Sequence, residues 1–520
     1  MRCYGGTAGT VRSELLRSES ASHGPPQDCR IKAIRLDNEQ TEKPPERPID
    51  RALQFLYGRI NYERQPTGRG LYPFRLARMR RLLRELGDPD THYVVVHIGG
   101  TKGKGSTSTM VAAMLTAGGL RTGLYTSPHL NHLGERFRVD GVACGDEELV
   151  DRVAAVREAT ERMEQDGKGS ATFFELTTAV ALLHFQRSGC QTAVLEVGLG
   201  GRLDSTNVCH PRVSAITSVG LDHQHILGDT VAEIAAEKAG ILKPGVPAIS
   251  GVADGPAREV IEAQAHHVGA PVWRIGRDFE VQCHAVQCHA LDKPSPNEPF
   301  SSEPWGTTFD YRSHVSESPD RLGWRIPLEG EHQGRNAGVA LAIIDALAAS
   351  GGPVVSLADQ RRGLSEVVCD ARTERFDLRP TVLLDAAHNT DSIAALCDVI
   401  RRRRGSQPVA IVFGTSHDKD AAAQLFQLIE ATEHLILTRF HENPRWRDPA
   451  EMAAIVEGYV ANHPANQRVT VEQKTLPTEA LQRAQQAVGP DGLVVVCGSF
   501  FLAAELRPLL LASPAVASPT

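Results

Sequence analysis

A glycine-rich stretch with two lysines follows an apolar run near residue 100. Residues 93 to 107 read Tyr-Val-Val-Val-His-Ile-Gly-Gly-Thr-Lys-Gly-Lys-Gly-Ser-Thr. Glycines let backbone N–H groups approach phosphate oxygens, a following helix N-terminus adds partial positive charge, and a lysine neutralises the terminal phosphates. Lys104 stands where such a lysine belongs, although Gly105 follows it instead of Ser or Thr. The stretch predicts a nucleotide phosphate loop, and a purely structural glycine turn is the alternative.

Polar side chains follow three further predicted strands, and these are Ser127, Glu196, Asp222 and His223. The carboxyl ends of parallel strands meet at one edge of a sheet, where ligands bind. Hydroxyl, carboxylate and imidazole groups beside a nucleotide suit Mg²⁺, which shares phosphate oxygens with the protein. Each residue also has a structural explanation: Ser127 could cap a turn, Glu196 could pair with Arg202, and His223 could be a surface histidine. Their occurrence together favours a metal and nucleotide site.

The elements that must position these residues alternate between buried strands and amphipathic helices. In the first half, strands are predicted at 94–98, 121–125, 193–197 and 213–217, and helices at 49–61, 74–86, 104–117, 146–164, 172–188, 230–241 and 330–348. In the second half, strands are predicted at 381–385, 408–413, 434–438, 468–471 and 493–497, and helices at 391–403, 420–431, 448–461, 477–487 and 501–511. This alternation is typical of mostly parallel, doubly wound α/β sheets.

Four regions are expected along the chain. Polar residues 1–48 are predicted to be a disordered extension, and residues 513–520 a frayed tail. Residues 49–370 are predicted to form a P-loop ATPase-like central domain with a variable loop at about 278–326. Residues 371–512 are predicted to form a smaller, Rossmann-like α/β domain.

Composition narrows the class of protein. The 520 residues are 41% hydrophobic and 23% charged, with a formal net charge of −7 and a pI near 6.3. These values are ordinary for a globular protein and argue against non-specific nucleic-acid or membrane-surface binding. The ten cysteines are scattered, mostly in apolar runs, as reduced core thiols of a cytoplasmic protein would be. We expect a cytoplasmic monomer that acts on small molecules, with no nucleic-acid or membrane partner.

One cysteine pattern needs a separate interpretation. Val-Gln-Cys-His-Ala occurs twice in residues 281–290, which brings Cys283, His284, Cys288 and His289 close in sequence. A soft-metal site is one reading. A five-residue offset, however, puts the two Cys-His pairs on opposite faces of a strand. A small tandem duplication is therefore favoured.

Seven motifs in order resemble the folylpolyglutamate synthase / dihydrofolate synthase family, whose members are ATP-dependent amide ligases related to the Mur ligases. The motifs occupy residues 100–107, 124–130, 196–207, 237–241, 332–337, 385–389 and 418–420, within a match from about residue 50 to 511. The resemblance implies a ligase that uses ATP, with two Mg²⁺ ions, to add L-glutamate to a reduced folate through an acyl phosphate. Dihydropteroate is a further candidate acceptor. A Mur-type ligase with another carboxylate substrate and a non-catalytic nucleotide-binding paralogue are the alternatives.

The resemblance also implies roles for individual residues. The phosphates would contact Gly100, Thr101, Gly103, Lys104, Gly105, Ser106 and Thr107. The metal ligands would be Ser127, Glu196, His223 and, once carbamylated, Lys238. Asn336 would contact adenine, Asp385 the ribose, and His388 would lie near the transferred phosphoryl group. Arg375 resembles an interdomain arginine that reaches the phosphates, with Arg372 as the alternative, and Arg136 would contact a substrate carboxylate. Lys104, His388, Lys238 and Arg136 are the expected catalytic residues.

Overall fold

A computed structural model of the chain describes residues 47–61, 76–165, 170–284, 305–315, 318–463 and 468–513. All of them belong to one compact unit, Arg47–Thr520. The predicted disordered extension lies outside the described residues up to residue 46, and the predicted tail lies outside them from residue 514. Among the described residues, no helix combines the length and the apolarity that crossing a bilayer requires.

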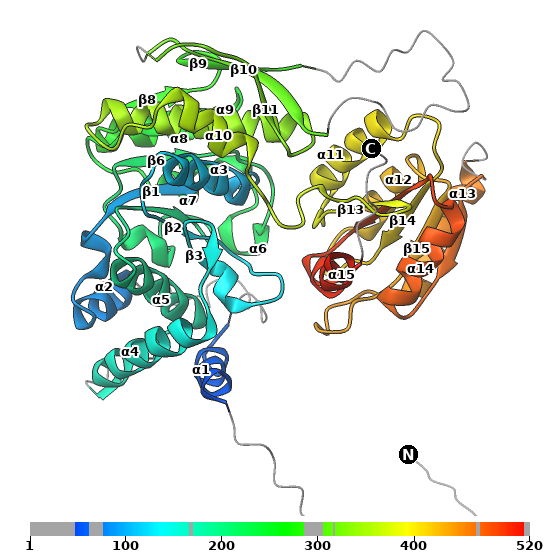
Figure 1. The fold of residues 1–520 in the computed structure, drawn as a ribbon, viewed down its shortest axis with the longest axis horizontal. Helices are drawn as coiled ribbons and strands as arrows, with labels where there is room; N and C mark the ends of the chain where they lie inside the picture. The colour runs from blue at the N-terminus through cyan, green and yellow to red at the C-terminus, as the bar shows by residue number, and fades with distance from the viewer. Residues whose placement is uncertain are drawn as a thin grey trace, which may run out of the picture. The chain divides into compact units, whose positions relative to one another are not determined.

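The first half contains an eight-stranded sheet in the order β4-β3-β2-β5-β1-β6-β7-β8 (Figure 1). Its strands are β1 Val94–Gly99, β2 Thr122–Tyr125, β3 Phe137–Val139, β4 Val142–Ala143, β5 Thr192–Glu196, β6 Val213–Ile216, β7 Ala248–Ser250 and β8 Val272–Arg274. The six strands from β2 to β8 in this order pair in parallel, whereas β3 and β4 add an antiparallel edge. The carboxyl ends of β1, β5 and β6 therefore lie side by side.

Helices cover both faces of this sheet. They are α1 Pro48–Tyr57, α2 Leu76–Glu85, α3 Lys104–Ala117, α4 Asp146–Gln165, α5 Phe173–Arg187, α6 Gln224–Leu227, α7 Val231–Ala239, α8 Pro256–Val268, α9 Glu331–Ala349 and α10 Leu357–Ser365, with short 3₁₀ turns η1 Pro89–Thr91, η2 Leu133–Arg136 and η3 Ser205–Val208. Alternate residues of β1 enter different cores. Val95 packs in the cluster with α4 and α5, and Val96 packs in the cluster with α3 and α9. Burial on both faces explains why the strand is a continuous apolar run.

A smaller antiparallel sheet, β11-β10-β9, contacts α9. Its strands are β9 Phe279–Cys283, β10 Thr307–Ser313 and β11 Arg321–Ile326. They occupy the segment where the sequence predicts short strands and a variable loop. Much of that loop, residues 285–304, lies outside the described residues.

The second half contains a six-stranded sheet in the order β12-β13-β17-β14-β15-β16. Its strands are β12 Glu374–Phe376, β13 Thr381–Leu384, β14 Val409–Phe413, β15 His434–Leu437, β16 Thr470–Gln473 and β17 Leu493–Cys497. All pairs are parallel except β12–β13. The helices are α11 Thr390–Arg403, α12 Ala421–Ile429, α13 Pro449–Asn462, α14 Pro477–Val488 and α15 Phe500–Ala512.

The predicted fold class, a mostly parallel α/β architecture in both halves, is confirmed. The longer predicted elements are present, and the predicted helix 104–117 coincides with α3. The sequence reading missed β3, β4, β7, β8, α8, α10 and β12. The missed strands have at most three residues. A hydrophobic period of two cannot be recognised over so short a stretch.

Candidate active site

The glycine-rich loop connects β1 to α3 and approaches its neighbours too closely for a side chain. Gly100 has φ of 146°, and a Cβ there would lie 2.1 Å from the Thr217 hydroxyl oxygen. Gly103, with φ of 80°, caps α3, and its Cβ would lie 2.3 Å from Asn336 Oδ1. Ser218, just after β6, accepts a hydrogen bond from the backbone N–H of residue 101 at 2.8 Å. The loop is therefore held open at a helix N-terminus, where phosphates bind.

Two lysines, the half-buried Lys104 and the buried Lys238, converge beneath this loop. Lys104 Nζ and Lys238 Nζ each donate a hydrogen bond to the Gly100 carbonyl, both at 3.0 Å. Burial lowers the pKa of Lys104, while nearby Glu196 opposes the fall. Burial, together with the Lys104 charge, lowers the pKa of Lys238 to about 7. A substantial fraction of Lys238 is therefore a neutral, nucleophilic amine near neutral pH.

Glu196 is the last residue of β5, and its carboxylate faces the same loop. It accepts the Ser127 backbone N–H at 3.1 Å. A Cβ at Gly105 would lie 3.6 Å from both of its oxygens. Burial raises the pKa of Glu196, and Lys104 opposes the rise. Arg202, its alternative partner in the sequence reading, pairs with Glu237 at 2.8 Å.

The donor set around Glu196 fits a magnesium ion. A buried carboxylate with a raised pKa is stabilised by a nearby cation, and the adjacent Ser127 offers a hydroxyl oxygen. His223, with φ of 51°, starts α6 after the end of β6. The His223 side chain is 49% exposed, yet desolvation by its surroundings lowers its pKa to about 4, and Asp222 opposes the fall. The neutral imidazole can therefore offer a lone pair to a metal.

A pocket of about 360 Å³ opens beside the phosphate loop. The loop, the ends of β6 and β7, and the first turns of α8 and α9 line it, with Lys102, Gly103, Ser218, Val219, Val252, Ala253, Gly255, Ile275, His332, Arg335, Asn336 and Val339 among the lining residues. Apolar side chains dominate, and a few amide and cationic groups are added. This combination is typical of nucleobase sites. Asn336, the predicted adenine contact, lies at the junction of pocket and loop.

The second half contributes Asp385 and His388, which follow β13. Asp385 accepts the backbone N–H groups of Thr373 and Ala387, both at 2.7 Å. His388 Nδ1 lies 2.8 Å from the Ala386 carbonyl oxygen and must donate to it. Burial and the charge of Lys102 lower the pKa of His388 to about 3. The ring is therefore neutral, with Nε2 as its acceptor nitrogen.

Two lysines that received no predicted role lie in this region. Lys102 Nζ donates to Asp222 Oδ2 at 2.7 Å. Burial by itself would raise the pKa of Asp222. Lys102, His223 and Lys419 outweigh this effect and hold the pKa below its usual range. Lys419 also acts on His388. In the sequence, Lys419 belongs to the motif at residues 418–420. That motif contributed to the family resemblance, but no chemical role was predicted for it.

The structure separates the two candidate interdomain arginines. Arg375, on β12, lies with its guanidinium 4.9 Å from the Trp305 ring centroid and pairs with Asp377. Arg372 stacks over Phe500 at 4.8 Å. Its charge opposes the rise that burial causes in the pKa of both Asp385 and Glu196. Of the two arginines, Arg372 is therefore the one that interacts electrostatically with Asp385 and Glu196, whereas Arg375 interacts with Asp377, Arg403 and Glu329.

Arg136 lies at the end of the loop that begins near Ser127. It is buried, and its Nε donates to His129 Nδ1 at 2.8 Å. Its guanidinium lies 5.3 Å from the Phe173 ring centroid. Tyr57 stacks on the same phenylalanine at 5.3 Å. The arginine is thus held by an aromatic and imidazole cluster beside the metal-ligand loop.

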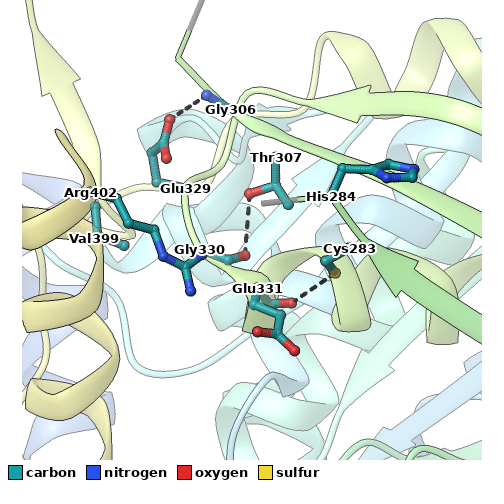
Figure 2. Close-up of a pocket in the computed structure, with 9 residues that line it drawn as sticks. All are labelled: Cys283, His284, Gly306, Thr307, Glu329, Gly330, Glu331, Val399 and Arg402. Atoms are coloured by element: carbon teal, nitrogen blue, oxygen red, sulfur yellow. Dashed lines mark hydrogen bonds between the residues drawn. The ribbon is translucent and has the colours of Figure 1, made fainter. Parts of the chain in front are cut away.

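The described half of the Cys-His duplication forms part of another pocket (Figure 2). Cys283 Sγ donates to the Glu331 carbonyl at 3.4 Å. His284 Nε2 lies 2.9 Å from Asp310 Oδ1. Figure 2 shows the two side chains pointing apart, so they do not converge on one ion. Cys288 and His289 lie outside the described residues.

Comparison with known proteins places this fold and site in a class. Residues 98–344 match the Mur ligase middle domain, and residues 371–500 match the Mur ligase glutamate ligase domain. The chain is therefore a ligase of the Mur type. A folylpolyglutamate synthase from Lacticaseibacillus casei is 34% identical over 84% of this chain and 94% of its own length. A dihydrofolate synthase/folylpolyglutamate synthase from Bacillus subtilis is 30% identical over 88% and 98%.

Solved structures agree with these relatives. The folylpolyglutamate synthase of Thermotoga maritima superposes with a TM-score of 0.73 at 29% identity, over 90% of this chain and 98% of that chain. The E. coli FolC structure, in complex with DHPP and ADP, has a TM-score of 0.73 at 26% identity over the same shares. The chain belongs to the folylpolyglutamate synthase / dihydrofolate synthase family, as its seven motifs predicted.

Proposed function

We propose that the chain joins L-glutamate to a reduced folate, with dihydropteroate as a second acceptor, at the expense of ATP. The observation that carries the proposal is the electrostatic interaction of Lys104, at the start of α3, with the buried Glu196, at the end of β5, beside a pocket of about 360 Å³. A carboxylate and ATP repel one another, so their reaction requires fixed positive charge and excluded water. The family's relatives, named as ligases of this kind, support the assignment.

The phosphate loop would bind ATP first. Lys104 Nζ donates hydrogen bonds to the Gly100 and Thr101 carbonyl oxygens, at 3.0 and 3.3 Å. When ATP binds, phosphate oxygens would replace these carbonyls as the acceptors of Lys104. Lys104 would then neutralise the terminal phosphates. Asn336 and the pocket beside Gly103 would hold the adenine. Ser127, Glu196 and His223 would hold one Mg²⁺, and carbamylated Lys238 would hold a second. The metal would supply charge neutralisation at the transferred phosphoryl group.

The chemistry would run in two displacements. A carboxylate oxygen of the acceptor attacks the γ-phosphorus, ADP leaves, and an acyl phosphate forms. The amine of glutamate then attacks the acyl carbon, phosphate leaves, and the amine loses a proton. Nε2 of neutral His388 would accept a hydrogen bond from the attacking amine and orient it; with a pKa of about 3 it is too weak a base to keep the proton, which passes to solvent. Lys102 and Lys419 would stabilise the anionic phosphoryl group, and Arg136 would contact a substrate carboxylate.

Residues of the second half would contact the ribose and the phosphates of ATP. Asp385 was predicted to contact the ribose, and its carboxylate already organises the turn that carries Arg372. We propose Arg372 in place of Arg375 as the arginine that reaches the phosphates. A cytoplasmic location and a monomeric state stay predictions from the sequence.

The deciding experiment is phosphate release from purified protein with ATP, Mg²⁺ and L-glutamate, comparing tetrahydrofolate with dihydropteroate. We expect release only when glutamate and a pterin substrate are both present, with ADP formed in equal amount. The Lys104→Ala variant should release none while retaining its melting temperature. Release without glutamate would indicate a nucleotide switch. Release with glutamate but only with a non-pterin carboxylate would indicate another Mur-type ligase.

A further inference from the structure

A cysteine, a histidine and a glutamate converge in the first half, away from the ligase site. They are Cys144, which follows β4, Glu148 in the first turn of α4, and His184 in the last turn of α5. One ligand atom from each lies within 4.8 Å of the other two. Cys144 and His184 are each 2% exposed, and Glu148 is exposed. Helices α4 and α5 pack against each other, which brings residues 40 positions apart in sequence together (Figure 1).

We propose that Cys144, Glu148 and His184 bind a Zn²⁺ ion, with a water molecule completing a tetrahedron on the exposed Glu148 side. Zn²⁺ accepts sulfur, nitrogen and oxygen ligands at about 2.0 to 2.3 Å, which places tetrahedral sulfur and nitrogen ligands about 3.6 Å apart. Cys144 Sγ and His184 Nδ1 lie 3.9 Å apart. A shift of a few tenths of an ångström would complete the coordination geometry.

The charges around the cluster suit a divalent cation. The Cys144 thiol loses its proton to solvent on binding, so one thiolate, one carboxylate and a neutral imidazole balance the two charges of zinc. The cation would overcome the burial that raises the pKa of Cys144 to about 12. Arg152 and Arg121 add positive charge near His184, and Asp151, which pairs with both Arg152 and Arg187, offsets part of it. The hydrogen bond that a metal would compete with at Glu148 is weak, because its carboxylate accepts the Gly145 N–H at 3.3 Å.

The site would fix the base of the loop that carries Ser127 and Arg136. The Cys144 backbone N–H donates to the carbonyls of Gly134 and Phe137, at 3.2 and 3.0 Å. A Cβ at Gly134 would lie 2.1 Å from the Cys144 carbonyl oxygen, so the two segments are in direct contact. A metal bound at Cys144 and His184 would therefore tie this loop to α5. The role is structural, and it does not depend on the proposed ligase activity.

Cobalt binding tests the proposal, because a Co²⁺–thiolate bond gives a near-ultraviolet charge-transfer band. Full-length, reduced, chelator-treated protein is titrated with Co²⁺ in excess Mg²⁺, and then with Zn²⁺. We expect one thiolate band that saturates at one equivalent and is displaced by Zn²⁺, and a melting temperature raised by at least about 3 °C with Zn²⁺. The ligase site holds no cysteine among its predicted ligands, so its binding of Co²⁺ would add no such band.

Matched variants separate this site from other thiols. Cys144→Ala should lose the band, and Glu148→Gln should weaken Co²⁺ binding about tenfold or more. Glu147→Gln, a neighbouring exposed carboxylate, and Cys190→Ala, another buried thiol, should keep both band and affinity. No thiolate band in wild-type protein, or a band that persists in Cys144→Ala, would overturn the proposal. Because Glu148 is exposed, its variant remains informative even if Cys144→Ala folds poorly.

Discussion

At the residue scale, the Gly100 carbonyl is the point where the phosphate loop concentrates positive charge. Lys104 and Lys238 share it as hydrogen-bond donors. Two ammonium groups at one acceptor repel each other, and the Lys104 charge adds to the burial that lowers the pKa of Lys238. Burial and the charge of Lys102 lower the pKa of Lys104. Conversion of Lys238 to an anionic carbamate would turn the repulsion into attraction. The same burial that destabilises its charged form leaves the amine nucleophilic.

The pKa of Lys238 has a consequence for stability. The pKa of Lys238 in the folded chain, about 7, lies below the ordinary lysine value of 10.5, so the unfolded chain binds more protons between these limits. Stability contributed by this group therefore rises with pH from about 7 to about 10. In CO₂-depleted buffer, Lys238→Met should melt higher than wild type at pH 7, with a gap that narrows toward pH 10, and should lose ligase activity.

Thermal melts across this pH range, with activity assays in added bicarbonate, check the Lys238 prediction. Lys474→Met, at a partly exposed lysine, provides the control and should show no gap that depends on pH. Full, bicarbonate-independent activity in the Lys238→Met variant would show that a carbamate at Lys238 is not part of the active site.

The two arginines of the second half can be tested against each other. Arg372→Gln should lower kcat/KM for ATP about a hundredfold or more, because its charge interacts with Glu196 and Asp385. Arg375→Gln should keep most of the activity, because this guanidinium stacks on Trp305. Steady-state kinetics with saturating glutamate would show the difference. The reverse order of effects would restore Arg375 to the role first predicted from the sequence.

At the element scale, the β1–α3 junction depends on backbone that only glycine adopts easily. Gly103 and Gly119 both have φ of 80°, but a Cβ at Gly119 would meet no atom within 4 Å, whereas one at Gly103 would meet Asn336. An alanine substitution therefore causes similar backbone strain at both sites, of about 1 kcal/mol or more. Only the substitution at Gly103 adds a clash inside the nucleotide pocket.

The Gly103→Ala variant should raise KM for ATP about tenfold or more, because displacement of the loop misplaces the phosphates. Gly119→Ala should leave KM unchanged and lower the melting temperature slightly. Kinetics and melts of both variants make the comparison. An equal KM effect in the two variants would mean that strain, and not the contact with Asn336, determines ATP binding.

At the scale of the whole molecule, an ion network joins the two halves at the segment between α10 and β12. Asp370 accepts Arg138, on β3, at 2.5 Å and Arg507, on α15, at 2.7 Å. Arg507 also pairs with Glu374 at 2.8 Å. These side chains are largely buried, so the network is shielded from solvent more than a surface pair would be. The network therefore connects β3 of the first half to β12 and α15 of the second.

Removal of the charge from Asp370 should therefore change catalysis without touching the site. Asp370→Asn should lower kcat several-fold to about tenfold, because the halves reach the assembled arrangement less often. It should also lower the melting temperature, because Arg138 and Arg507 lose a largely buried partner. Asp398→Asn, in an exposed pair with Arg401 on α11, is the control and should have no effect. Kinetics at saturating substrates provide the measurement. Unchanged kcat in Asp370→Asn would show that this network does not contribute to assembly of the site.

The sequence by itself determined the long elements, the phosphate loop and the family. These rest on local signals: apolar periodicity over many residues, glycines that a phosphate requires, and ordered motifs. The fold class and family were confirmed.

Tertiary structure alone decided which groups meet. It placed Arg372, and not Arg375, near Asp385, joined Lys102 to Asp222 across 120 positions, and brought Cys144 to His184. It also determined the short antiparallel edges. Such pairings depend on sheet order and helix packing between distant segments, and local periodicity does not encode which distant segments become neighbours. The phosphate loop could therefore be predicted from its own residues. That Lys104 and Lys238 share the Gly100 carbonyl as their acceptor could be seen only in the folded chain.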